Sequence, residues 1–197
     1  MAILKIARMG HPVLRQIAAP VPPELITSDE VQRLIDDMLD TVDDANGAGL
    51  AAPQVHESVR IVVLELSAER GMEVWINPVL TPVAADITES DDSEGIDDES
   101  NEDEDDLEGQ LLYTYEGCLS VPGLRGLVGR IPAIDVRGRR RDGSRFHMEL
   151  RGFAAVVAQH ECDHLDGVLY VDKVEPQTLA FVEEHRRYGL GAGEEEE

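Results

Sequence analysis

The chain has 197 residues, of which 42% are hydrophobic, and a formal net charge of −24 at pH 7. This length suits one domain with a sizeable core, and no apolar run approaches the roughly 20 residues that a membrane-spanning helix needs. Cys118 and Cys162 are the two cysteines, which excludes a disulfide framework and suits a reducing compartment. Residues 1–15 lack a long apolar segment and a small-residue cleavage site, so we expect no signal peptide.

The negative charge is concentrated in two segments. Residues 86–108 contain 14 acidic residues and no basic one, and residues 194–197 add four glutamates. Without them the chain has 23 acidic and 17 basic residues, a net charge of −6. Segments with so many charges and so few apolar side chains cannot bury enough apolar surface to offset the entropy cost of ordering them. We predict one domain at 1–190 with a disordered acidic insertion at 84–109, and a disordered tail at 191–197.

Residues 27–44 predict the first helix. Thr27 and Glu30 fit a capping box, and apolar residues recur at spacings of three and four, as on one buried face. Asn46-Gly47 follows, and we expect the glycine to end the helix in a left-handed conformation.

Strands and two further helices follow. The β-branched and apolar segments 59–66 and 72–80 predict strands, and Asp142-Gly143 between AIDVRGRRR and SRFHMEL predicts a hairpin with a type I′ turn. Residues 152–167 predict a buried helix that ends at Gly167, and a shorter helix is expected from Pro176 to about Tyr188. We expect an α+β fold in which antiparallel strands pack around the central helix at 152–167.

This central helix contains QHECDHLDG at 159–167. At about 100° per residue, His160 and His164 lie one above the other on one face, where two imidazoles can bind one metal ion. Glu161 beside them can act as a general base for water that the metal activates. Cys162 points about 160° away and is predicted to be an inert core residue. The alternative is a helix whose two histidines bind no metal and are satisfied by other partners. We favour the metal, because burying ionisable groups is costly unless they have partners.

Several residues are candidates for the third ligand. Tyr170 occupies the position where one class of zinc proteases has a third histidine, so that protease pattern is incomplete. A downstream glutamate is available as Glu175, Glu183 or Glu184. Cys118 in YEGCLSVPG is the better candidate, because a thiolate binds Fe²⁺ or Zn²⁺ well and a Cys/His₂ set leaves a fourth position open.

The segment GAGLAAPQ at 47–54 formally matches a nucleotide-binding pattern. That pattern must follow a strand and open a helix, whereas this segment follows a predicted helix, and Pro53 disfavours a long helix after it. We expect instead that the glycines let backbone approach a substrate closely.

Three of these segments together resemble the signature motifs of the peptide deformylases: GAGLAAPQ at 47–54, EGCLS at 116–120 and QHECDHLDG at 159–167, in the family's order. GHPVLR at 10–15 is similar to the family's opening, and the resemblance covers roughly residues 4–185. It implies a hydrolase that removes the N-formyl group from the initiator methionine of newly made polypeptides and releases formate.

The resemblance also implies a role for each matching residue. Cys118, His160 and His164 hold the metal, Glu161 is the general acid/base, and Gln54 with the backbone N–H of Leu119 stabilises the oxyanion. The implied substrate-binding residues are Ala48, Gly49, Gly117, Arg125, Phe153 and Val156, while Val157 fits either the methionine pocket or the core. Backbone groups of Gly49 and Gly117 would pair with the substrate as an added strand.

The implied cofactor is one divalent metal ion per chain, Fe²⁺ in the cell, with Zn²⁺, Ni²⁺ or Co²⁺ possible in preparations. The implied partners are N-formylmethionyl nascent polypeptides in the bacterial cytoplasm, with the ribosome near its exit as a further candidate. No membrane partner is expected. Direct nucleic-acid binding is not expected either, because the negative net charge argues against affinity for nucleic acid. Two rivals stay open: a zinc protease, and a metal protein with a closed structural site, which needs a fourth protein ligand.

Overall fold

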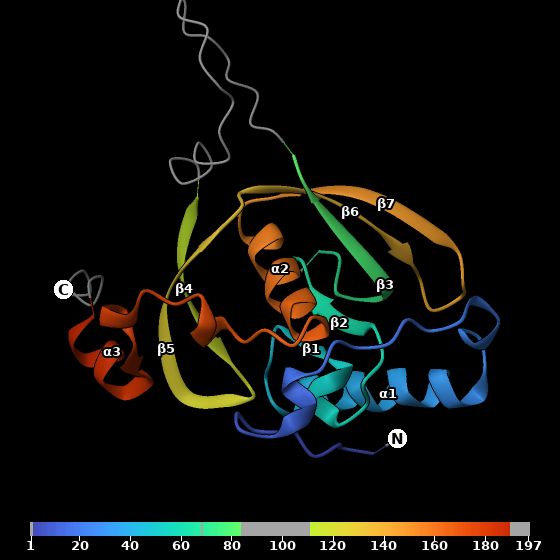
Figure 1. The fold of residues 1–197 in the computed structure, drawn as a ribbon, viewed down its shortest axis with the longest axis horizontal. Coiled ribbons are helices and arrows are strands. Elements are labelled where there is room, and N and C mark those ends of the chain that lie inside the picture. Colours follow the sequence, from blue (N-terminus) through green and yellow to red (C-terminus); the bar gives the residue numbers. More distant parts are fainter. Residues whose placement is uncertain (1, 68, 84–110, 190–197) are drawn as a thin grey trace, which may run out of the picture.

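The computed structural model describes residues 2–67, 69–83 and 111–189, and it shows a mixed α/β fold with two antiparallel sheets (Figure 1). The disordered insertion predicted at 84–109 and the tail predicted at 191–197 lie outside the described residues. Within the described residues, every helix is too short or too polar to cross a membrane.

The larger sheet has the strand order β1-β2-β3-β6-β7, and the smaller sheet has the order β4-β5-β8. The strands of the larger sheet are β1 (Gly49–Ala51), β2 (Ile61–Glu65), β3 (Met72–Pro82), β6 (Ala133–Arg139) and β7 (Arg145–Arg151). Those of the smaller sheet are β4 (Leu112–Cys118), β5 (Val121–Arg130) and β8 (Ala180–Phe181). Strands β1 and β4 are edge strands, so each has one side without a strand partner among the described residues.

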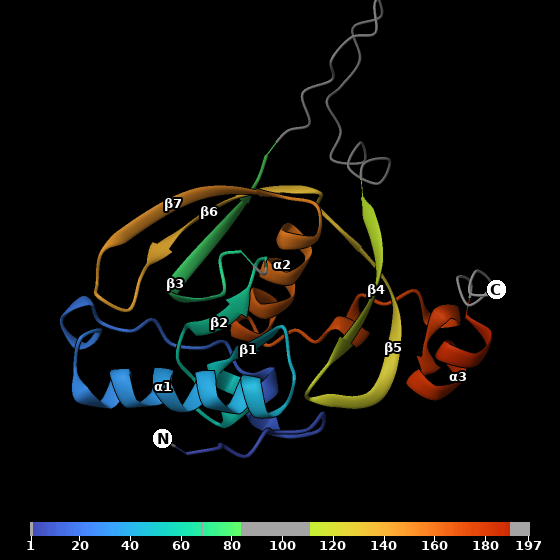
Figure 2. The same cartoon turned by 180° about the vertical axis from the view of Figure 1, so that it is seen from behind.

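In the described part of the chain, three α-helices pack against these sheets: α1 (Asp29–Asp44), α2 (Phe153–Leu165) and α3 (Val182–Tyr188). Helix α2 contacts strands of both sheets and lies between them in both views (Figures 1 and 2). Helix α1 contacts β1 and β2, and α3 contacts β5 and β8. The fold therefore places α2 where residues from both sheets can reach it.

The core has one apolar layer on each face of β2. Val62 and Leu64 belong to the cluster that includes α2, whereas Ile61 and Val63 belong to the cluster that includes α1. Successive strand residues point to opposite faces, so a strand that is covered on both sides is apolar throughout. This explains why the sequence of β2 is an unbroken apolar run rather than an alternating one.

The ends of α1 differ from the prediction. The N-cap is Ser28, not Thr27: its hydroxyl accepts a hydrogen bond from the N–H of Val31 at 3.4 Å. Beyond the other end, Asn46 rather than Gly47 has a left-handed backbone, with a φ of 51°. Asparagine tolerates this conformation because its short side chain can hydrogen-bond locally.

The predicted hairpin forms between β6 and β7, but its turn is not type I′. Gly143 has a φ of 84°, while Asp142 is not among the described residues with positive φ. The side chain of Asp142 instead accepts a hydrogen bond from the N–H of Ser144 at 2.8 Å. This local hydrogen bond stabilises a longer loop than the two-residue turn that we expected.

The C-terminal segment also differs, and four of the described strands were not predicted: β1, β4, β5 and β8. Residues Pro176–Thr178 form a 3₁₀ turn, β8 follows, and α3 begins only at Val182. Strands β4 and β5 were not recognised because glycines and Pro122 interrupt their pattern. Helix α2 ends as expected, since Gly167 follows it with a φ of 75°.

Candidate active site

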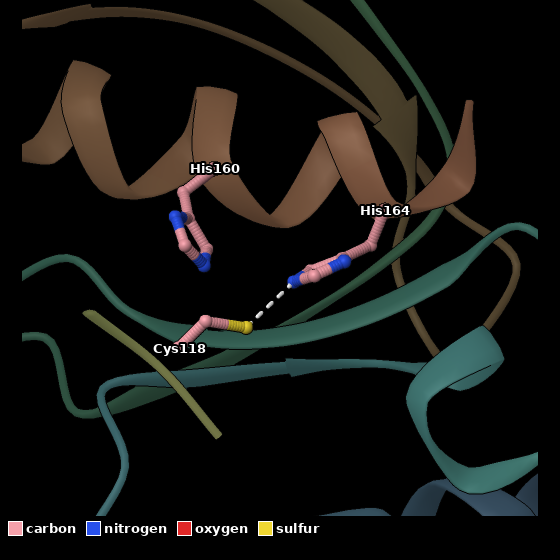
Figure 3. A group of neighbouring side chains, drawn as sticks. All are labelled: Cys118, His160 and His164. Atoms are coloured by element: carbon pink, nitrogen blue, oxygen red, sulfur yellow. Dashed lines mark hydrogen bonds between the residues drawn. The ribbon is translucent and has the colours of Figure 1, made fainter. Parts of the chain in front are cut away.

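Three side chains that can ligate a metal meet between β4 and α2 (Figure 3). Cys118 ends β4, while His160 and His164 project from one face of α2. Sγ of Cys118 lies 3.2 Å from Nε2 of His164, and the ligand atoms of all three residues lie within 4.8 Å of one another. The i, i+4 spacing on the helix and the end of one edge strand thus create a single donor cluster.

The glutamates that we considered as alternative ligands lie elsewhere. Glu175, Glu183 and Glu184 are exposed, and none of them belongs to the donor cluster. Cys162 is buried on another face of α2, and burial raises the pKa of its thiol well above the ordinary value. Among the described residues, the cluster therefore has three ligands and no fourth.

Glu116 fixes the orientation of His160. Its Oε2 lies 2.8 Å from Nδ1 of His160. With Nδ1–H donating to this carboxylate, Nε2 keeps the lone pair that a metal needs. Burial favours the neutral acid, but hydrogen bonds from Arg130 and His160 outweigh it and lower the pKa of Glu116 to about 2. Glu116 therefore stays a carboxylate and holds the ring in one tautomer.

Arg130 in turn holds Glu116. Its Nε and Nη2 donate to the two oxygens of Glu116 at 2.7 and 2.8 Å, and its Nη1 pairs with Asp163 of α2. Arg130 is 2% exposed, so this bidentate pair lies in the core. None of these residues was predicted from the sequence to have a role. Recognition of β4 as a strand would have indicated Glu116, because residues two apart share a face with Cys118.

Gln54 is buried on the 3₁₀ helix η3 (Ala52–Val55) that follows β1. Its Oε1 accepts a hydrogen bond from the N–H of Ala51 at 2.8 Å. Its Nε2 donates to Oγ of Ser120 at 3.1 Å and lies 3.5 Å from Sγ of Cys118. These contacts distinguish Oε1 from Nε2 of the amide, and they orient the N–H donors of Nε2 toward the donor cluster.

Glu161 is buried beside β1, with 5% of its surface exposed. Burial raises its pKa to about 7, and its Oε2 has no hydrogen-bond partner within the described residues. A group with a pKa near the working pH both accepts and returns a proton efficiently. The side chain next to the donor cluster is thus suited to proton transfer.

The donor cluster fits a divalent metal ion. Nδ1 of His164 is buried without a partner among the described residues, and burial lowers the pKa of this imidazole, which favours the neutral form that ligates. Burial also lowers the pKa of His160, but hydrogen bonds with Cys118 and Glu116 raise it to about 10. A cation would replace that proton, as metal binding to imidazole and thiolate does in general.

A cavity of about 590 Å³ opens beside the cluster. It is lined by Gln54, Leu119, His160 and Glu161 and by most of the predicted substrate residues, namely Ala48, Gly49, Gly117, Phe153, Val156 and Val157. Phe153 is 65% exposed, which places it at the mouth. Arg125 does not line the cavity: its guanidinium lies 5.4 Å from the ring centre of Tyr115 and donates to that residue's carbonyl at 3.2 Å.

The site combines one sulfur and two imidazole donors with a buried carboxylate at the wall of a cavity. This arrangement is typical of a mononuclear metallohydrolase. The fold and the site together therefore define this class of enzyme.

Comparisons with known proteins identify the family. A family model described as polypeptide deformylase matches residues 3–180. A peptide deformylase from Pseudomonas aeruginosa is 40% identical over 173 residues, which cover 87% of each chain. Peptide deformylase 1 from Prochlorococcus marinus is 37% identical over 201 residues, which cover 96% of this chain and 91% of the relative. The chain therefore belongs to the peptide deformylase family, enzymes that remove the N-formyl group from newly made polypeptides.

Solved structures agree with this assignment. A class I type b peptide deformylase from Acinetobacter baumannii with bound Met-Ala-Ser superposes with a TM-score of 0.71 at 29% identity, covering 88% of this chain and 99% of that one. An actinonin complex from Synechococcus elongatus superposes with a TM-score of 0.70 at 34% identity, covering 89% and 80%. The structural similarity thus extends over 88% to 89% of this chain.

Proposed function

We propose that Cys118, His160 and His164 hold one divalent metal ion and that Glu161 carries the proton during deformylation. The observation that carries this proposal is the donor cluster of three ligand atoms within 4.8 Å on the wall of the cavity. Three ligands leave a coordination position open, which favours a catalytic site over a closed structural one. In this arrangement the central helix α2 carries the metal motif.

The residues of the chain divide the work of hydrolysis. A divalent cation held by the cluster supplies Lewis-acid chemistry, which polarises a carbonyl oxygen and lowers the pKa of water. Glu161 accepts a proton from the water that attacks the formyl carbon. As the C–N bond breaks, Glu161 returns the proton to the amine of methionine, and formate leaves. The pKa of about 7 for this buried carboxyl group suits both steps.

Gln54 and Leu119 stabilise the charge that develops on the formyl oxygen. The amide of Gln54 is held by Ala51 and Ser120, so its N–H donors are oriented before the substrate arrives. Preorganised donors of this kind contribute strongly to catalysis because they need no reorganisation during the reaction. The backbone N–H of Leu119 is the second donor in this proposal.

The substrate lies between the two edge strands. Gly49 of β1 and Gly117 of β4 both line the cavity, and each belongs to a strand with one unpaired side. An extended peptide can therefore pair with these strands, while Ala48, Phe153 and Val156 surround the methionine side chain. The Met-Ala-Ser complex of the Acinetobacter enzyme supports a peptide substrate.

The wider setting follows from the same activity. We assign Fe²⁺ as the ion in the cell, because a thiolate with two imidazoles suits it and a reducing compartment protects the thiolate. The substrates are nascent polypeptides in the cytoplasm, and the ribosome near its exit is a candidate partner. The described residues act as one catalytic domain, since both sheets contribute to the same cavity.

The direct test is formate release from an N-formylmethionyl peptide by protein loaded anaerobically with Fe²⁺. We expect one metal ion per chain, loss of turnover on chelation, and recovery when the metal is added back. Cys118→Ser and His164→Ala should lose the metal. Turnover that persists in fully metal-free protein would contradict the proposal.

A further inference from the structure

The C-terminal helix α3 forms one wall of the cavity, far from the metal ligands in the sequence. Val182 and Arg186, which lie four residues apart and therefore on one face of the helix, both line the cavity. From the sequence we expected a helix here, and we considered only Glu183 and Glu184 in it, as alternative metal ligands. One face of α3 therefore meets whatever occupies the outer part of the cavity.

Packing fixes this wall in place. The ring of His185 lies against the ring of Tyr115 in β4, with ring centres 4.3 Å apart. Strand β8, which leads directly into α3, pairs with β5 through Leu124↔Phe181. Because Tyr115 also lines the cavity, β4 and α3 contribute neighbouring parts of the same surface. Figure 1 shows α3 beside the smaller sheet.

Arg186 gives this wall a positive charge. It is the only lysine or arginine among the described residues that line the cavity, and it is exposed. Within the described part of the chain, it has no recorded ion pair, whereas Arg130 and Arg15 are both paired with aspartates. The acidic residues in the lining, Glu116 and Glu161, are buried near the metal ligands and do not neutralise it.

The position of α3 indicates which part of a substrate it meets. A peptide that pairs with Gly117 of β4 and continues along this strand reaches Tyr115 two residues later, at about 3.3 Å per residue. The ring of Tyr115 contacts α3. We propose that α3 forms a specificity subsite in which Arg186 selects substrates with an acidic side chain at the third or fourth residue. This inference rests on the deformylase function proposed above.

The test compares amidated peptides, so that no C-terminal carboxylate takes part. N-formyl-Met-Ala-Xaa-Xaa-amide is prepared with Xaa as Glu, Gln or Lys, and kcat/KM is measured for the full chain, Arg186→Gln, Arg186→Glu and Arg187→Gln. Arg187 is the matched control, because it is on the same helix but does not line the cavity.

We expect the parent to favour Glu over Lys and Arg186→Gln to lower this preference by about three- to tenfold, as the loss of partly exposed charge contacts predicts. The change should lie in KM, because contacts far from the reacting bond stabilise substrate and transition state alike. Arg186→Glu should reverse the preference, and added salt should weaken it. Arg187→Gln should behave as the parent does.

Two failures are distinguishable. In the first, formate is released from the Gln peptide, but the ratio of kcat/KM for the Glu peptide to that for the Lys peptide is the same in the parent and in Arg186→Gln. This result would overturn the subsite while leaving the deformylase function intact. No formate from any peptide, with metal bound, would overturn the deformylase function itself. An equal change in Arg187→Gln would also overturn the subsite, because general surface charge would then explain the effect.

Discussion

Gly49 and Glu161 are fitted to each other at the centre of the site. A Cβ atom at position 49 would lie 2.5 Å from Oε1 of Glu161 and 2.8 Å from its Cγ. Glu161 is buried, so its carboxylate has little room to turn aside. We expected this glycine to let backbone approach the substrate, and the structure adds that it lets β1 approach the carboxylate of Glu161.

Gly49→Ala should therefore lower kcat/KM for formate release by about 100-fold, because a misplacement of about 1 Å in a catalytic group can cost this much. The metal content should stay at one ion per chain, since the three atoms nearest to a Cβ at position 49 belong to Glu161 and not to the donor cluster. Atomic absorption and a formate assay on the same sample check both statements. An unchanged kcat/KM in the folded variant would show that β1 does not set the position of the carboxylate.

At the residue scale, short-range spacing indicated part of the cluster. The i, i+4 histidines and the intervening glutamate follow from helix geometry alone, and Cys118 was favoured for its thiolate chemistry. Glu116 and Arg130 could not be found in this way. They are 14 residues apart and meet only because β4 and β5 pair, which the sequence analysis did not predict.

At the scale of elements, one buried ion network ties the smaller sheet to α2. Arg130 at the end of β5 contacts Glu116 in β4 and Asp163 in α2, and Glu116 contacts His160. The network links all three elements that carry or support the proposed metal ligands. Removing one member of such a buried pair is costly because it leaves an uncompensated charge.

Glu116→Gln should lower the free energy of unfolding by about 3 kcal/mol at pH 7 and weaken metal binding by about 10- to 100-fold. The folded pKa of about 2 lies below the ordinary value of 4.5. The stabilisation is therefore complete above pH 4.5 and is lost as the pH falls toward 2. Urea unfolding of the metal-free proteins across this range should show the difference between parent and variant shrinking.

Glu149→Gln is the matched control, because Glu149 pairs with Arg151 at the exposed surface of β7. Its effect should stay within about 1 kcal/mol. If Glu116→Gln costs no more than this control, or if its effect is the same at every pH, the network does not stabilise the site in the way described.

The elements themselves were predictable where their signals are local. Helices α1 and α2 and the paired strands β2, β3, β6 and β7 follow from apolar patterns and turn residues. The exact caps and the turn type did not follow. Ser28 and Asn46 act at the ends of α1 in place of their neighbours Thr27 and Gly47, and Asp142 accepts a local hydrogen bond instead of adopting a positive φ. The start of α3 was placed too early, because Pro176 opens a 3₁₀ turn instead.

At the scale of the molecule, the proposed metal joins parts that are otherwise separate in the sequence. Cys118 belongs to the smaller sheet, while the two histidines lie on α2, which packs against the larger sheet. An ion held by all three residues would cross-link the two halves of the cavity. A ligand that binds only the folded chain stabilises it in proportion to the logarithm of its free concentration.

Metal removal should therefore lower the melting temperature, and the folded state should gain about 4 kcal/mol when the free metal reaches about 1,000 times its dissociation constant. Calorimetry at a series of buffered metal concentrations measures this dependence. Cys162→Ala alters a buried cysteine outside the cluster, so its melting temperature should still rise with the metal concentration. The melting temperature of Cys118→Ser should no longer depend on metal. A melting temperature that is independent of metal in the parent would argue against a cluster that binds the ion.

The most direct single measurement is formate release by the parent and by Glu161→Gln at equal metal content. This substitution keeps the shape of the side chain and leaves the three proposed ligands in place, but it removes the carboxyl group that we propose to carry the proton. We expect turnover of an N-formylmethionyl peptide by the parent and a loss of about 100- to 10,000-fold in the variant. Equal turnover by the two proteins would contradict the role of Glu161, on which the mechanism depends.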